Sequence, residues 1–195
     1  MKRAMCIPFA MILVLLATSC SVKPSKEELL RSMVDRVSEV ESYQLEAEVD
    51  VDGERFLMRQ WFLSPDSLRT VVTGRSELEQ ILVLNQGKAH AYYSATRQWV
   101  ALSEPDTGPF PWGMPLLFLL SEVAKGDVTI TETFSSVKVS ARGVEGWDRC
   151  EIVISLRSRL PEACVLTRGQ HMVKVQILSF VSDFSLSQEL FLPGR

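Results

Sequence analysis

The sequence contains few of the residues from which catalytic and metal sites are built. Among its 195 residues there are two histidines, His90 and His171, and four cysteines. None of these occurs at metal-ligand spacing such as Cys-x-x-Cys or His-x-x-His, and no serine lies in a Gly-x-Ser-x-Gly turn. Because a catalytic site needs a positioned base with an orienting partner, the sequence predicts a protein that is not an enzyme and holds neither a metal nor a cofactor.

The sequence also lacks a long apolar run and a basic tract. The apolar run from Ile7 to Ala17 spans 11 residues, whereas a helix that crosses a membrane permanently needs about 20. The formal net charge is -3, and no segment is rich in Lys and Arg. These absences argue against a permanent membrane span at the N-terminus and against a nucleic-acid partner.

The first 19 residues have the features of a bacterial lipoprotein signal peptide. Two basic residues precede the apolar run, and small residues follow it. The tetrapeptide ATSC, which ends at Cys20, resembles the lipobox, although Leu is usual where Ala17 stands. The sequence predicts a signal peptide over residues 1–19, lipidation of Cys20, a short tether over residues 20–25, and an extracytoplasmic protein anchored to a bacterial membrane. An ordinary signal peptide with a chance cysteine, or an uncleaved anchor, remains the alternative.

Residues 26–195 are predicted to form one domain that opens with a helix and continues in strands. Ser25 and Glu28 form a capping box, and apolar residues from Leu29 to Val40 recur at spacings of three and four. From Tyr43 onward apolar and polar residues alternate, as in a strand with one buried face. Turns such as Asp52-Gly53 separate further short strands, a pattern typical of an antiparallel meander.

A proline-rich segment interrupts the strands. Prolines at four positions between residues 105 and 115 prevent regular strand pairing. Pro115 can occupy the first turn of a helix that runs from Leu116 to Lys125, and more strands follow. The sequence predicts an α+β fold, in which an incomplete, half-open antiparallel β-barrel is combined with an N-terminal helix and a proline-rich helical lid.

Two cysteines, Cys150 and Cys164, lie on neighbouring predicted strands joined by a turn. If these strands pair near that register, the two thiols can form a disulfide, which an extracytoplasmic location permits. The alternative is a pair of buried free thiols that act as small apolar residues. Either role is structural.

Four stretches, in this order, resemble the LolA/LolB-like superfamily of outer-membrane lipoprotein carriers and receptors. They are VESYQLEAEV, WFLSPDSLRTVV, EQILVLNQGKAHAYYSATRQWV and RLPEACVLTRGQHMVKVQILSFVSDFSLSQELF. The resemblance implies an incomplete barrel with helices as a lid over an apolar cavity. It also implies that Arg69 contacts the lid, because carriers place an arginine at that position. The lipobox favours an anchored relative, similar to the germination lipoprotein GerS of spore-forming bacteria.

Twelve apolar and aromatic residues are candidates for the inner face of the barrel or its lid, where a ligand would bind. They are Phe56, Met58, Phe62, Leu68, Ile81, Val83, Tyr92, Trp99, Phe110, Trp112, Leu117 and Phe118. A closely packed core needs the same side chains as a cavity for acyl chains, so both alternatives stay open. Residues 105–115 are the predicted movable flap.

Two functional hypotheses follow from the anchor and the resemblance. In the first, the protein binds an acyl chain or a lipoprotein on its apolar concave face. In the second, it is a GerS-like tethered protein that docks and activates an envelope or spore-cortex enzyme such as an amidase. The second hypothesis requires exposed apolar residues, and Leu57 and Trp61 are predicted on the face opposite Phe56 and Met58.

Overall fold

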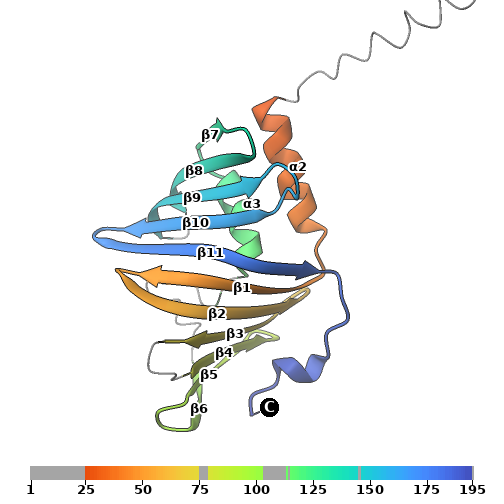
Figure 1. Ribbon diagram of the computed structural model, residues 1–195. Helices are drawn as coiled ribbons and strands as arrows, with labels where there is room; N and C mark the ends of the chain where they lie inside the picture. Colours follow the sequence, from red (N-terminus) through yellow and green to blue (C-terminus); the bar gives the residue numbers. More distant parts are fainter. Residues whose placement is uncertain (1–24, 75–78, 103–112, 114, 145, 195) are drawn as a thin grey trace, which may run out of the picture.

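The computed structural model describes residues 25–74, 79–102, 113, 115–144 and 146–194, which form a curled antiparallel sheet with both α-helices on one face (Figure 1). In this part of the chain the sheet has 11 strands, in the order β6-β5-β4-β3-β2-β1-β11-β10-β9-β8-β7. The N-terminal strands are β1 (Ser42–Val51), β2 (Glu54–Leu63), β3 (Ser67–Thr73), β4 (Glu79–Asn85), β5 (Lys88–Tyr93) and β6 (Gln98–Leu102). The C-terminal strands are β7 (Val128–Glu132), β8 (Ser136–Val144), β9 (Trp147–Ser155), β10 (Pro161–Arg168) and β11 (His171–Ser182).

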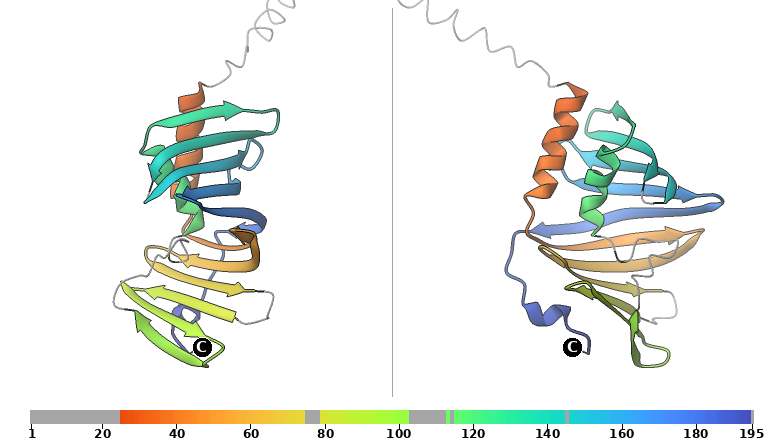
Figure 2. Two further views of the ribbon diagram at one scale, coloured as in Figure 1. Left: turned by 90° about the vertical axis from the view of Figure 1, so that its left-hand side faces the viewer. Right: turned by 180° about the vertical axis from the view of Figure 1, so that it is seen from behind.

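The sheet consists of two meanders that meet in its middle. Strands β1 to β6 pair in chain order and strands β7 to β11 do the same, while β1 pairs with β11 from Tyr43–Ser182 to Val51–Val173. Strands β6 and β7 are therefore the two edges of the described sheet, which curls without closing into a barrel (Figure 2). The predicted α+β fold with a half-open antiparallel barrel is confirmed.

Helix α2 (Lys26–Ser38) begins at the predicted capping box. The backbone N–H of Glu28 donates to Ser25 Oγ at 3.1 Å, and the N–H of Ser25 donates to the Glu28 carboxylate at 2.8 Å. These two bonds satisfy amides that the start of a helix leaves unpaired. Leu30, Met33 and Val37 are buried in the main core. No helix within the described ranges is both long enough and apolar enough to span a bilayer.

The helices cover the concave face of the sheet. Helix α2, the 3-10 helix η1 (Leu116–Phe118) and helix α3 (Leu119–Ala124) lie on this side (Figure 2). Alternation along β1 turns four apolar residues inward, and each is at most 1% exposed: Tyr43, Leu45, Ala47 and Val49. They pack with the inward residues of β8 to β11 and with both α-helices in one hydrophobic core.

The helix predicted after Pro115 is present as η1 followed by α3, which ends at Ala124. Leu116, Leu117, Leu119 and Leu120 are all buried. The sheet and α2 enclose this segment, which explains why its residues are apolar. Residues 105–112 and 114 of the predicted flap lie outside the described residues.

The end of the chain returns over the outer face of the sheet. The segment after β11 includes η2 (Gln188–Phe191), which lies against β3 and β4. Phe191 is fully buried there, and Val71 and Val83 are buried on the same face of these strands. They form a second, smaller apolar cluster outside the main core.

Candidate functional site

A buried polar cluster lies at the centre of the concave face. Gln60 of β2 is opposite Thr70 of β3, and Gln60 Nε2 donates to Thr70 Oγ1 at 3.2 Å. Gln60 Oε1 accepts from the Tyr43 hydroxyl at 2.5 Å and from the backbone N–H of Leu116 at 2.9 Å. Burial raises the pKa of Tyr43, so its phenol stays a neutral donor. The start of η1 is thereby fastened to the middle of the sheet.

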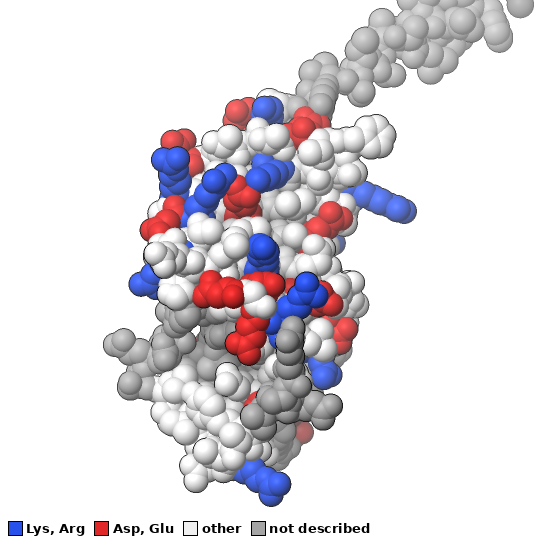
Figure 3. Space-filling view, turned by 60° about the vertical axis from the view of Figure 1, so that its left-hand side comes forward, with Lys and Arg blue, Asp and Glu red and all other residues white. Residues whose placement is uncertain are grey.

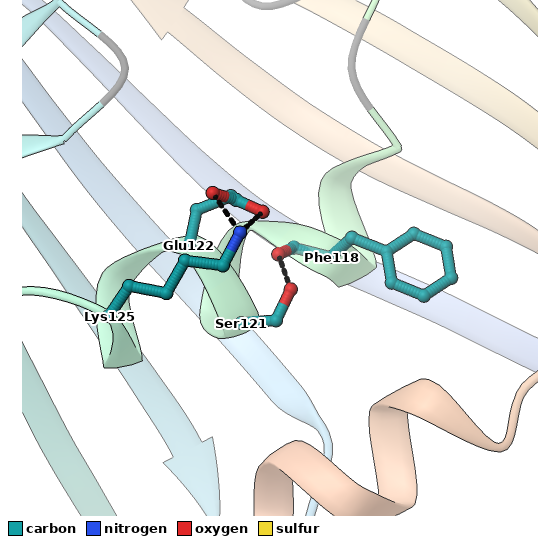
Figure 4. Close-up of polar contacts among 4 residues, drawn as sticks. All are labelled: Phe118, Ser121, Glu122 and Lys125. Atoms are coloured by element: carbon teal, nitrogen blue, oxygen red, sulfur yellow. Dashed lines mark hydrogen bonds and ion pairs between the residues drawn. The ribbon is translucent and has the colours of Figure 1, made fainter.

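Aromatic rings fill the space between the sheet and η1. Tyr43 stacks on Phe62 with ring centroids 5.5 Å apart, and Phe62 meets Phe118 edge-on at 5.0 Å. The ring centroid of Phe180 in β11 lies 5.7 Å from that of Tyr43. The ring of Phe118 points away from the Glu122–Lys125 ion pair further along the helix (Figure 4). This part of the concave face is a packed core.

The predicted cavity residues do not form one surface. Four of them lie on the concave face of β2 and β3: Phe56, Met58, Phe62 and Leu68. Leu117 and Phe118 of the lid pack in the same core. Another four lie on the outer face: Ile81, Val83, Tyr92 and Trp99. In the strand register Ile81 is opposite Val71 on one side and Tyr92 on the other, and Tyr92 is opposite Trp99. Phe110 and Trp112 lie outside the described residues.

The physical reason for this correction is the continuous apolar run of β4. The sequence ILVL offers an apolar residue to both faces, so its pattern does not determine which residues turn inward. A shift of one residue exchanges the two faces of a strand. In the structure Leu84 lies opposite Leu68 and Val83 lies opposite Arg69, which turns Val83 outward.

Arg69 also lies on the outer face, and it contacts the C-terminal segment. Its Nη1 donates to the carbonyl of Leu190 at 3.1 Å, while Asn85 Nδ2 donates to the carbonyl of Phe191 at 3.2 Å. Partial burial lowers the pKa of Arg69. Arg69 therefore contacts η2, on the side of β3 opposite to η1 and α3, whereas flap residues 105–112 lie outside the described residues.

The thiols of Cys150 and Cys164 are buried and free. They lie on paired strands, but Cys150 is opposite Leu166 and Cys164 is opposite Ile152. Such diagonal neighbours are about 7–8 Å apart, whereas a disulfide needs Cβ atoms within about 4.5 Å. Of the two alternatives left open by the sequence, the structure has the pair of free thiols.

A groove opens between α2, α3 and the edge strand β7. It has a volume of about 530 Å³, within the usual range for ligand sites. Its walls are apolar, formed by Leu30, Val34, Ala124, Val128 and Ile130. Lys26, Glu27 and Arg31 line its rim. This groove depends on how α2 lies beside β7, so the sequence alone does not predict it.

A second hollow lies on the outer face of β7, β8 and β9, with a volume of about 500 Å³. It is lined mainly by hydroxyl and charged side chains: Asp127, Thr129, Thr131, Lys138, Ser140, Ala141, Arg142 and Arg149. Glu151 binds Lys138 at 2.6 Å and also pairs with Arg149. Figure 3 shows charges of both signs gathered over the half of the molecule built from β7 to β11, and few over β3 to β6.

No protein-family model matches the chain, and no curated protein matches it in sequence. Solved structures match in fold. The Pseudomonas aeruginosa MucA/MucB complex contains a chain with 13% identity and a TM-score of 0.51, and the match covers 86% of this chain and 60% of that chain. A DUF1329 family protein from Desulfovibrio piger has 10% identity and a TM-score of 0.50, with 86% and 95% covered.

Two further structures match with lower TM-scores. The LolA superfamily protein NE2245 from Nitrosomonas europaea has a TM-score of 0.43 at 10% identity, covering 84% of this chain and 97% of that chain. The Clostridioides difficile complex of the CwlD amidase with the GerS lipoprotein contains a chain with a TM-score of 0.42 at 15% identity, with 85% and 98% covered. At these identities the similarity is one of fold. What the matches with TM-scores of at least 0.50 confirm is the predicted fold: a curled antiparallel sheet with helices on its concave face.

Proposed function

We propose that this chain is a lipid-anchored, extracytoplasmic binding protein that docks a protein partner close to a bacterial membrane. In this proposal Cys20 carries the lipid, residues 20–25 form the tether, and the sheet presents the docking surface. The chain has no catalytic role of its own. The partner class that the sequence resemblance implies is an envelope or spore-cortex hydrolase such as an amidase.

The packed concave face is the observation that carries this proposal. Side chains of both α-helices have no exposed surface where they cover the sheet: Met33, Val37, Leu120 and Val123. The Gln60 cluster and the aromatic rings fill the space beside η1. A sheet whose concave face is occupied by its own helices offers its outer face and its edges to partners. The MucA/MucB complex, whose matching chain shares this fold, supports a role in binding proteins.

Native mass spectrometry of the processed protein, released gently from membranes, tests docking against lipid carriage. The covalent lipid on Cys20 adds a mass that survives unfolding, whereas an acyl ligand held in the fold adds a mass that unfolding removes. We expect no removable mass, either as purified or after incubation with palmitate. A removable acyl mass in most molecules would contradict the docking proposal.

The second candidate function is binding of an acyl chain in the groove between α2 and β7, which its apolar walls favour. The substitution Val34→Asp would place a charge in this groove. Ser38→Asp introduces the same charge at an exposed position of the same helix and serves as the control. Lipid uptake that is lost with Val34→Asp and kept with Ser38→Asp would support carriage. Equal uptake by both variants would exclude this groove as the site.

A further inference from the structure

Strand β7 ends the sheet beside α2. One side of β7 pairs with β8, and in the described part of the chain no strand pairs with its other side. Lys26 Nζ donates to the carbonyl of Ile130 at 3.2 Å, so this carbonyl points away from β8. Backbone groups of every second residue share a direction in an antiparallel ladder, which turns those of Val128 outward as well. A lysine is a common means of protecting such an edge from unwanted strand pairing.

A different hollow borders each side of this edge. On the concave side lies the groove, with Leu30 and Val34 in its wall. On the outer side lies the polar hollow, with Lys138 and Arg142 in its lining. Thr129 lines both hollows, so they flank one and the same strand. A strand added to β7 would therefore have one apolar and one charged environment.

Three basic side chains, those of Lys138, Arg142 and Arg149, line the outer hollow with only one acidic side chain, Asp127, in a chain whose formal net charge is -3. Arg142 lies directly opposite Arg149 in the register, a juxtaposition of like charges that is unfavourable unless an anion intervenes. Both oxygens of Glu151 are used by Lys138 and Arg149. Arg142 makes no ion pair with any residue that the structure describes. The hollow is therefore complementary to carboxylates from a partner.

We propose that β7 accepts an extended segment of the partner protein as an additional strand, and that this segment alternates apolar and acidic residues. Successive side chains of a strand point to opposite faces. The apolar ones would enter the groove beside α2, and the acidic ones would reach Lys138 and Arg142. Backbone bonds to Val128 and Ile130 would supply affinity, and Lys26 Nζ would leave the Ile130 carbonyl. This inference rests on the proposed docking function and specifies its partner.

Peptide binding to the full-length protein in detergent tests the inference. The probe is a fluorescent peptide of about seven residues, the length of an ordinary strand, in which valine and glutamate alternate. Three controls are a valine–lysine peptide, a peptide with all valines before all glutamates, and the alternating peptide N-methylated on every second amide. We expect fluorescence anisotropy to show binding of the alternating peptide alone. Equal binding of the four peptides, or binding of none, would overturn the inference.

Variants of the protein locate the binding site. Arg142→Glu removes a charge-assisted contact worth about 1.5–3 kcal/mol and should weaken binding of the valine–glutamate peptide about tenfold or more. Arg157→Glu makes the same change in the exposed turn after β9 and should leave binding unchanged. Equal affinities of the two variants would overturn the proposed position of the strand. Binding restored to Arg142→Glu by the valine–lysine peptide would support it directly.

Failure of this inference is distinguishable from failure of the proposed function. If no peptide binds and the native mass shows no removable lipid, strand addition at β7 is wrong and docking elsewhere stands. If no peptide binds and a removable acyl mass is found, both proposals are wrong.

Discussion

At the scale of the residue, Gln60 is a polar side chain that is only 1% exposed. Its side chain holds together β1, β3 and η1 through hydrogen bonds with Tyr43, Thr70 and Leu116. Gln60→Leu keeps the size of the side chain but leaves the hydroxyl of Tyr43 and the amide of Leu116 without their acceptor. We expect a loss of about 1–3 kcal/mol in the free energy of unfolding for each buried donor left unpaired.

Urea unfolding of this variant checks the prediction. Gln98→Leu, at an exposed position of β6, is the matched control and should change the free energy of unfolding by less than about 0.5 kcal/mol. Similar midpoints for the two variants would mean that the buried cluster does not fasten η1 to the sheet.

The two cysteines yield a prediction about reactivity. Burial raises the pKa of Cys150 to about 12 and raises the pKa of Cys164 as well, and the thiolate is the reactive form of cysteine. We expect both thiols to resist a thiol reagent in the folded protein and to react fully in denaturant. An intact mass lower by two hydrogens, restored by a reductant, would show the disulfide that the register excludes.

We expect the pair formed by Asp52 and His171 to make the stability of the fold depend on pH. The hydrogen bond with His171 Nδ1, at 2.7 Å, lowers the pKa of Asp52 below its ordinary value of 3.8, and the backbone N–H of Met172 contributes. A carboxyl with a lowered pKa stabilises the fold above its ordinary pKa, and this stabilisation is lost as the pH falls through the folded-state pKa.

Melting temperatures of wild type and Asp52→Asn test this linkage. We expect the variant to melt below wild type at neutral pH, and the difference to shrink as the pH falls below 3.8, the ordinary pKa. Asp66→Asn, in the exposed turn between β2 and β3, should follow wild type throughout. A difference for Asp52→Asn that persists in strong acid would contradict the proposed linkage.

At the scale of the element, the C-terminal segment is held to β3 and β4 mainly through Phe191. Phe191→Ala removes a fully buried ring from the outer face, a change that typically costs about 3–5 kcal/mol. We expect lower urea stability and faster proteolytic cleavage after β11. Leu192→Ala, at a residue 40% exposed, is the control. Equal cleavage of the two variants would show that Phe191 does not secure the segment.

The elements themselves could be predicted from sequence, whereas the faces of some strands could not. The capping box at Ser25 and the alternation from Tyr43 to Val51 depend on local periodicity, and both occur as predicted. In β4 the run Ile81 to Leu84 is apolar on both faces, because the C-terminal segment covers the outer side with a second cluster. Nothing local in β4 records that distant contact.

The groove and the charged hollow beside β7 were beyond sequence reasoning for a related reason. Each combines residues far apart in the chain, such as Lys26 with Ile130 and Thr129 with Arg149. The opposition of Arg142 and Arg149 follows from the pairing of β8 with β9. The register of β9 with β10 likewise places Cys164 opposite Ile152, two residues from Cys150. Sites of this kind can be identified only when the register of the paired strands is known.

At the scale of the whole molecule, the proposed anchor determines where the sheet can act. Cys20→Ser removes the site of lipidation, and two or three acyl chains are what makes such an anchor stable. We expect wild type to sediment with membranes and to incorporate labelled palmitate. The variant should incorporate none and should no longer carry the diacylglyceryl mass. Equal palmitate labelling of both proteins would place any lipid elsewhere.

The single junction between the two meanders has a consequence for folding kinetics. In the described part of the chain every strand pairing except that of β1 with β11 joins neighbours in sequence. Hairpins of neighbouring strands close short loops, whereas pairing Tyr43 with Ser182 closes a loop that contains most of the chain. Among the strand pairings, the entropy cost of closing a long loop therefore falls on that of β1 with β11. We therefore expect each meander to form from local contacts, and the pairing of β1 with β11 to limit the rate at which the core beneath α2 and α3 is completed.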